Sequence, residues 1–149
     1  MSDRGAFPPH AYVPGQTERH PEGWFDDIRN TVPVEGAPEV DLMQCKAFVT
    51  GLAYIESGYF WEAHEVLEPV WMASPQRSEC QAALLGLIQL ANAQLKETME
   101  QPKAALRLYI IAKGHFNSIK SKTVLGIDVQ KITSDIEALH QTIIMQNNA

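Results

Sequence analysis

Between Gly58 and Trp71 the sequence has one histidine and three glutamates, and three of these residues could do chemistry together: His64, Glu65 and Glu68. If this stretch is helical, His64 and Glu68 are one turn apart, and side chains four residues apart meet on a helix surface. A carboxylate beside an imidazole fixes the tautomer of the ring and raises its basicity, which prepares the histidine as a base or a ligand. These three residues are therefore the candidate catalytic residues.

The predicted orientation of this helix places the pair on the apolar side. At about 100° per residue, Trp71 and Phe60 lie only about 20° and 40° from His64. Glu68 lies about 40° away on the other side, whereas Glu62 points the opposite way and is expected in water. An unpaired buried carboxylate costs several kcal/mol, so Glu68 needs a partner. We therefore expect His64 and Glu68 to be buried together.

A polar stripe on the next helix could complete a pocket around this pair. Its residues recur at three- and four-residue spacing along an otherwise apolar helix, and buried amides require hydrogen-bond partners. His20 lies beside Pro21 in the N-terminal segment, which could fold over the helices and bring the imidazole to the pocket. The candidate ligand-binding residues for a small polar ligand are Gln89, Asn92, Lys96, Trp61, Trp71 and His20.

Pro69 lies inside the same predicted helix. A proline has no N–H to donate to the carbonyl four residues earlier, here that of Glu65, and its ring presses on that carbonyl. We expect a bend at Pro69 and a free carbonyl at Glu65. This carbonyl could serve as a ligand or bind water.

Three interpretations of the His64–Glu68 pair stay open: a structural network, a small-ligand pocket and a metal site. The Glu-x-x-His signature of di-metal helical bundles is absent, because Trp61 stands three residues before His64. Two carboxylates and one imidazole on one helix are not a recognised ligand set, so we predict no metal ligands and leave any cofactor unknown. The histidines that remain, His10, His115 and His140, are weaker candidates.

Helix-breaking residues predict the elements that carry these side chains. Apolar residues recur at helical spacing from near Glu39, and Ser57-Gly58 ends that pattern. Ser74-Pro75, Gln101-Pro102 and a loop over residues 120–126 separate three further helices and a last one. No strand is predicted. Because short loops join antiparallel neighbours, we expect an all-α fold: a compact bundle of about five helices built from antiparallel helical hairpins.

The helix predicted from about Ser78 to Met99 is apolar on nearly all sides, which is typical of a central, buried helix. Gly86 in its middle costs helix stability relative to alanine and is expected to permit a close helix crossing. Residues 1–38 are different, since they contain six of the nine prolines and no helical period. We predict an irregular proline-rich arm over residues 1–38, packing on a single helical domain over residues 39–149.

Composition excludes several classes of protein. The net charge is −6 and the basic residues are scattered, so no coherent surface for nucleic acid is expected. The longest uncharged run, residues 80–95, is shorter than the roughly 20 apolar residues that a membrane span needs. Cys45 and Cys80 form no metal or disulfide motif and are expected to be reduced, buried thiols. The start of the chain has no apolar signal segment, so a cytoplasmic protein is expected.

The stretch GYFWEAHEVLEPVW, followed by LLGLIQLANA, resembles a helical family catalogued as domain of unknown function 309. The pattern of that family is Gly-x-Tyr-Phe-Glu-Ala-His-Glu, a tryptophan and a Gly-Leu-Ile-Gln run, here with Trp61 as an extra residue. The Tyr12-Val-Pro-Gly15 and His20-Pro21 segments are similar to the arm motif of longer members, so the resemblance extends over most of the chain. It implies an all-helical fold and an important His64, and it names no substrate.

This sequence departs from the family pattern in two places, because members often carry a histidine where Lys96 stands and a glycine near Glu100. A charged lysine cannot ligate a metal, which disfavours the metal interpretation.

Two functions fit these features. In the first, His64 acts as acid or base, Glu68 orients it, and Lys96 and Gln89 bind a small polar ligand. The alternative is a non-catalytic interaction scaffold of helical hairpins, similar to tetratricopeptide repeats, with His64 and Glu68 as a structural network; two hairpins are fewer than the three or so repeats that such arrays need. The apolar segment 106–111 exceeds what one inward face requires, so a homo-oligomer is expected.

Overall fold

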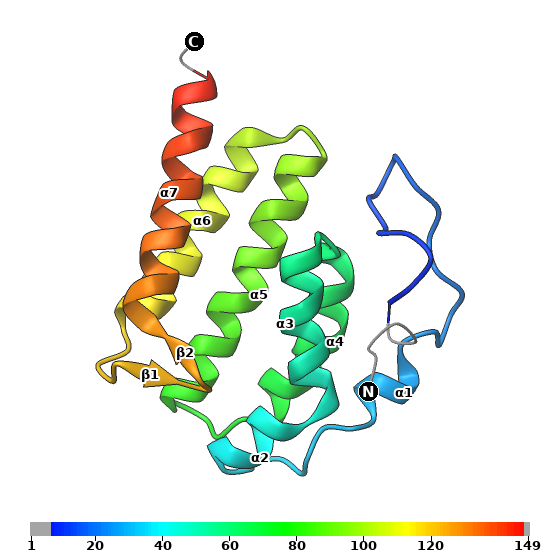
Figure 1. The fold of residues 1–149 in the computed structure, drawn as a ribbon, viewed down its shortest axis with the longest axis vertical. Coiled ribbons are helices and arrows are strands. Elements are labelled where there is room, and N and C mark those ends of the chain that lie inside the picture. The colour runs from blue at the N-terminus through cyan, green and yellow to red at the C-terminus, as the bar shows by residue number, and fades with distance from the viewer. Residues whose placement is uncertain (1–6, 148–149) are drawn as a thin grey trace.

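The computed structural model describes residues 7–147 and has an all-α body, as predicted (Figure 1). Five long helices follow one another as antiparallel neighbours: α3 (Lys46–Ser57), α4 (Phe60–Ala73), α5 (Glu79–Thr98), α6 (Pro102–Asn117) and α7 (Val129–Asn147). Two short helices precede them, α1 (Asp26–Arg29) and α2 (Glu39–Gln44). The predicted fold class is confirmed, and α1 adds one helical turn to an arm that was expected to have none.

The predicted helix ends fall where the sequence placed them. Gly58 ends α3 in the left-handed conformation, with φ +85°. The hydroxyl of Ser78 accepts the N–H of Gln81 and so caps α5, while Pro102 occupies the first turn of α6. One difference is a break at Cys45 between α2 and α3. There the arm residue Thr31 accepts the N–H of Ala47 at 2.9 Å and caps the start of α3.

A small antiparallel hairpin precedes α7, with β1 (Thr123–Val124) paired to β2 (Ile127–Asp128). The sequence predicted no strand, because two-residue strands are too short to show an alternating pattern. Leu125 and Gly126 connect them, both with positive φ, as a tight hairpin turn requires. Leu125 is buried, and its N–H donates to the carboxylate of Glu39 at 2.5 Å, which holds this turn against α2.

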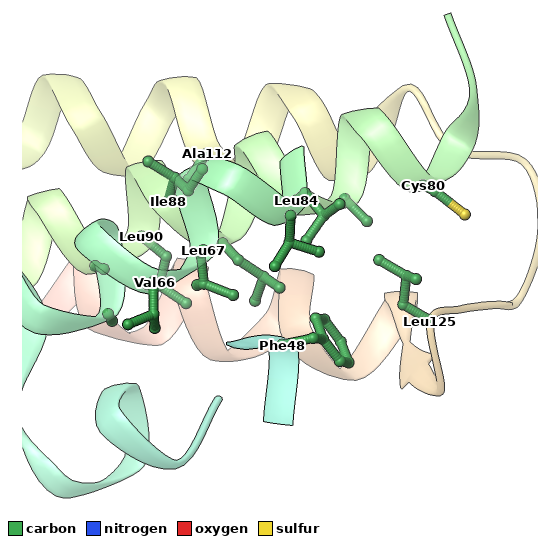
Figure 2. Close-up of a cluster of buried hydrophobic side chains, with 14 of the residues drawn as sticks. Phe48, Val66, Leu67, Cys80, Leu84, Ile88, Leu90, Ala112 and Leu125 are labelled. Carbon is green, nitrogen blue, oxygen red and sulfur yellow. The ribbon is translucent and has the colours of Figure 1, made fainter. Parts of the chain in front are cut away.

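Helix α5 occupies the centre of the fold and packs against α4 and α6 (Figure 1). Figure 2 shows its Leu84 and Ile88 within the core, beside Val66 and Leu67 of α4. The predicted close crossing at Gly86 is confirmed, because a Cβ built there would lie 2.6 Å from the Phe116 ring of α6.

None of the helices within residues 7–147 is long and apolar enough to cross a membrane. Cys45 and Cys80 are both buried and free, as expected for thiols that pack as small apolar groups. Burial raises the pKa of the Cys80 thiol to about 11, and the carboxylates of Glu39 and Glu79 add to this effect.

Candidate functional site

The N-terminal arm follows helix α4 along its length and is bonded to it near both ends (Figure 1). Near the start of the helix, His20 and Tyr12 contact Glu62. In the middle, the guanidinium of Arg29 donates to the backbone carbonyl of Glu65. At the end, the N–H groups of residues 36 and 37 donate to the carbonyl of Ala73. Helix α4 therefore carries the candidate site and also the residues that bind the arm.

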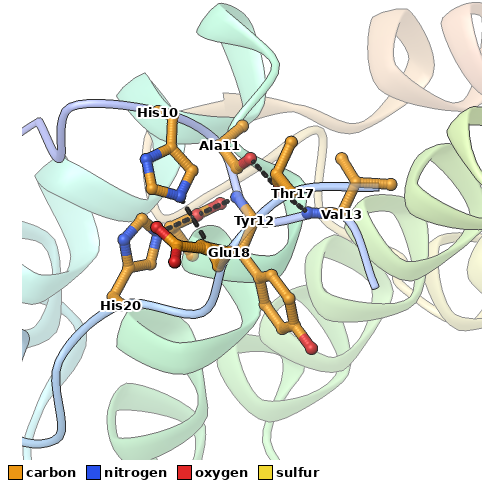
Figure 3. Close-up of polar contacts among 8 residues, drawn as sticks. His10, Ala11, Tyr12, Val13, Thr17, Glu18 and His20 are labelled. Carbon is orange, nitrogen blue, oxygen red and sulfur yellow. Dashed lines mark hydrogen bonds and ion pairs between the residues drawn. The ribbon is translucent and has the colours of Figure 1, made fainter. Parts of the chain in front are cut away.

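The first of these contacts involves the carboxylate of Glu62, which is fully buried. We call Glu62 and its arm partner His20 the latch, and Figure 3 shows His20 among the neighbouring arm residues. Oε2 of Glu62 lies 2.5 Å from Nε2 of His20 and accepts the backbone N–H of Tyr12 at 2.6 Å. The exposed fractions of the two side chains are 2% for His20 and 0% for Glu62. A carboxylate removed from water is tolerated only with such partners, and here both come from the arm.

Aromatic rings enclose the latch. The His20 ring lies 4.8 Å from that of His10, between ring centroids, and it also contacts Trp24, Phe25 and Trp61. The imidazole of His10 in turn bonds to the backbone carbonyl of Glu18 at 2.7 Å, which fixes the arm segment around the latch (Figure 3). Burial raises the pKa of Tyr54 nearby, and the negative charge of Glu62 raises it further.

Two buried polar atoms of the latch have no hydrogen-bond partner within the described residues: Nδ1 of His20 and Oε1 of Glu62. Buried polar groups are normally paired, so the hydrogen-bonding capacity of the latch is only partly satisfied. The latch is nevertheless closed, because the arm residues cover it. It can orient and hold the arm, and a ligand could reach it only if the arm moved.

The prediction that Glu62 points into water is wrong. The buried face of α4 is formed by Glu62, Ala63, Val66, Leu67, Val70 and Ala73. At about 100° per residue, Ala63, Val66 and Val70 lie about 100–160° from His64, so the helix is turned almost opposite to the predicted orientation. The physical reason is that α4 has two covered faces: α3 and α5 contact one, and the arm with its aromatic residues covers another.

The carbonyl that Pro69 leaves free finds a partner in the arm. Helix α4 continues through Pro69 to Ala73, and the carbonyl of Glu65 accepts from Nη1 of Arg29 instead of from a backbone N–H. The same Nη1 lies 3.6 Å from Oε2 of Glu65. The free carbonyl expected from the sequence thus serves to attach the arm to α4.

The predicted His64–Glu68 pair forms, but the prediction that it is buried is wrong. Nε2 of His64 lies 3.1 Å from Oε2 of Glu68, and the exposed fractions of the two side chains are 33% and 46%. The pair therefore needs no pocket to be stable. It is instead an accessible imidazole held by a carboxylate, next to Glu65 and its arm partner Arg29.

The other predicted site residues are distributed over α4 and α5. Gln89, Asn92 and Lys96 are half-buried on α5, where the Asn92 amide donates to Gln89 at 3.4 Å. Within residues 7–147, no hydrogen bond joins this stripe to His64 or Glu68.

The two tryptophans of α4 have different surroundings. Trp61 packs under the arm, with its ring 5.1 Å from that of Tyr12. Trp71 is half-buried, and its indole N–H is buried without a partner within the described residues. In the part of the chain that the structure describes, no three histidine, cysteine or acidic side chains are grouped so as to hold a metal.

Sequence reasoning named His20 and missed the other residues that attach the arm to α4, Glu62, Tyr12 and Arg29. The signal that could have found them is the aromatic content of the arm taken together with that of α4, since Tyr12, Trp24 and Phe25 need an apolar surface to cover. Trp61 on α4 provides part of that surface, and Glu62 is its neighbour in the chain. An aromatic residue beside an acid, opposite an aromatic arm, could have indicated a covered carboxylate.

The fold and site define a class: an all-helical protein in which an N-terminal arm is latched to the helix that carries an accessible His–Glu pair. Residues 48–108 match the model of a family described as a domain of unknown function, DUF309. This confirms the resemblance over the segment from α3 into α6, which contains His64, Glu68 and Gln89. The arm and α7 lie outside the match, which is therefore shorter than the resemblance expected from the sequence. No curated protein and no solved structure matches the chain.

Proposed function

We propose that this protein binds a small polar ligand at the outer face of α4, with His64 and Glu68 as the central residues and Glu65 with Arg29 at its edge. The observation that carries the proposal is the His64–Glu68 hydrogen bond of 3.1 Å on an accessible surface. Two carboxylate anchors of the arm, Glu62 and Glu65, bracket His64 in sequence. Glu68 orients the imidazole, and Arg29 of the arm is held at the next residue along the helix, Glu65.

The chemistry of this face suits a ligand that has both donors and acceptors. Glu68 occupies Nε2 of His64, and the other ring nitrogen has no bonded partner within the described residues. A ring held in this way can exchange a proton with a bound group, which is the role proposed for His64 if the protein is an enzyme. Trp71, three residues after Glu68, has a buried indole N–H that lacks an acceptor within the described residues. The polar stripe of α5 would extend the site only if the ligand bridges the two helices.

A thermal-shift screen of small polar metabolites against the wild type and His64→Gln tests this proposal. We expect a ligand that stabilises the wild type, by about 2.7 kcal/mol at a hundredfold excess over its dissociation constant. The variant should lose this stabilisation while its unliganded stability changes by about 0.5 kcal/mol or less, since His64 is accessible. Glu68→Gln should weaken the binding of the same ligand.

His140→Gln is the matched control, because His140 is a half-buried histidine on another helix, α7. It should bind the ligand like the wild type. The proposal fails if no metabolite distinguishes the wild type from His64→Gln, or if His64→Gln alone destabilises the protein by several kcal/mol, as a structural network would.

A second candidate function, a non-catalytic interaction scaffold, is supported by exposed apolar side chains. The exposed fractions of Ile110 and Ile111 on α6 are 60% and 44%, and Met145 on α7 is also exposed. Exposed apolar side chains favour association, and a second copy of the chain is the simplest partner. The successive hairpins α3–α4 and α5–α6 would provide the scaffold.

We expect a homo-oligomer by light scattering and a shift toward the monomer for Ile110→Glu, because a charge on this surface must stay hydrated. Thr142→Glu, at another exposed position on α7, should keep the mass of the wild type. A monomeric wild type at high concentration would remove the support for self-association.

We also infer a cytoplasmic location, supported by the two free thiols, since disulfides are typical of oxidising compartments.

A further inference from the structure

A groove of about 450 Å³ separates α7 from α3 and α5, on the other side of the fold from the arm (Figure 1). Leucine and isoleucine side chains form its floor, among them Leu52 of α3, Leu87 and Leu90 of α5, and Leu139 of α7. This volume lies within the range typical of small-molecule sites, which are mostly apolar with a few polar groups. It shares no residue with the proposed ligand site on α4.

The polar groups that line the groove are mostly hydrogen-bond acceptors. Three carboxylates border it, those of Glu56, Asp128 and Asp135, and Lys131 is the only basic residue among its lining residues. Lys131 is already paired, with Nζ 2.9 Å from Oδ2 of Asp135. Asp128 accepts the backbone N–H of Lys131 at 3.0 Å and so caps the start of α7. Because Lys131 neutralises only one of the three carboxylates, the net charge of the side chains that line the groove is negative.

Two acceptors in the groove lack donors within the described residues. The buried Oε1 of Gln94 has no hydrogen-bond partner, and Glu56 has neither a hydrogen bond nor an ion pair. Because α4 runs antiparallel to both α3 and α5, those two helices run in the same direction, and Glu56 and Gln94 both lie near their C-terminal ends. The partial negative charge at the end of α3 adds to the attraction for a cation.

We propose that this groove binds a small aliphatic amine in its protonated form. The hydrocarbon chain lies on the leucine and isoleucine floor, and the ammonium group donates to Gln94 and pairs with Glu56. An ammonium carries three donors and no acceptor, which matches a site whose unpaired groups, Gln94 Oε1 and the Glu56 carboxylate, are acceptors. A fatty acid of the same length would instead place a second carboxylate beside Glu56, and an alcohol would leave that carboxylate without its charge partner.

Titration calorimetry with n-octylammonium chloride, sodium octanoate and 1-octanol tests the proposal on the full chain. We expect octylammonium to bind, octanol to bind about tenfold or more weakly, and octanoate to give no heat of binding, because a charged hydrogen bond is worth about this factor. Amide chemical shifts in a labelled sample should change around Leu52, Leu90 and Leu139.

Glu56→Gln and Gln94→Met should each weaken octylammonium binding about tenfold or more. Glu35→Gln and Gln130→Met, the same changes at exposed positions outside the groove, should bind like the wild type. His64→Gln should leave amine binding unchanged, which separates this site from the one on α4. Equal binding of the amine and the alcohol, shifts confined to other surfaces, or no binding of the amine would each overturn the proposal.

Discussion

Replacing Glu62 with alanine should lower the free energy of unfolding by about 3–5 kcal/mol, the usual cost of removing one partner from a buried acid–base pair. The change removes the acceptor for His20 and for the N–H of Tyr12, and both would stay buried without a partner unless the arm detached. Urea denaturation measures the loss. Faster proteolytic cleavage within residues 7–38 would show that the arm is the part released.

Glu68→Ala is the matched control for this prediction. It removes the same side chain from the same helix, where Glu68 also pairs with a histidine, but that pair is partly exposed. Exposed pairs contribute about 0–1 kcal/mol, so Glu68→Ala should change stability little. Similar losses for the two variants would contradict the buried latch.

The conservative change Glu62→Gln keeps the shape of the side chain and removes its charge, so it separates the contributions of the two to stability. Its amide oxygen can still accept the N–H of Tyr12. We therefore expect a free energy of unfolding between that of the wild type and that of Glu62→Ala. His20→Ala should cost about as much as Glu62→Ala, and the double variant should cost less than the sum, because the two residues form one interaction.

The fold was predictable because its boundaries depend on local chemistry. A glycine at Gly58, a serine cap at Ser78 and a proline at Pro102 each act within one turn of their own position, so the helix ends could be inferred without tertiary contacts. The break at Cys45 could not, because Thr31 from the arm caps the helix that follows. The β-hairpin is likewise stabilised by a distant residue, Glu39.

The candidate site was predicted only in part, for the same reason. The His64–Glu68 contact spans one helical turn and follows from spacing alone. The orientation of α4 does not follow from spacing. Its aromatic residues pack against two different neighbours, whereas helical periodicity alone assigns all of them to one buried face. Glu62 is compensated by His20, which lies 42 residues earlier in the chain, and no pattern within the helix contains that information.

Phe116→Ala should lower the free energy of unfolding by about 3–5 kcal/mol, because the ring is fully buried between α6 and α5 and leaves a cavity. The more informative measurement is what this change does to Gly86. In the wild type, a Cβ at Gly86 would lie 2.6 Å from Phe116, so Gly86→Ala should destabilise the protein by about 1–3 kcal/mol despite the better helix propensity of alanine.

With Phe116 replaced by alanine, the obstacle is gone, and Gly86→Ala should stabilise the variant by about 1 kcal/mol, the helix propensity difference. Gly114→Ala on α6 is the control, because a Cβ there meets nothing within 4 Å, and it should stabilise both backgrounds. If Phe116→Ala does not fold, Phe116→Leu gives the same comparison with a smaller cavity. A destabilising Gly86→Ala in every background would mean that backbone packing, and not the Phe116 ring, requires glycine at this crossing.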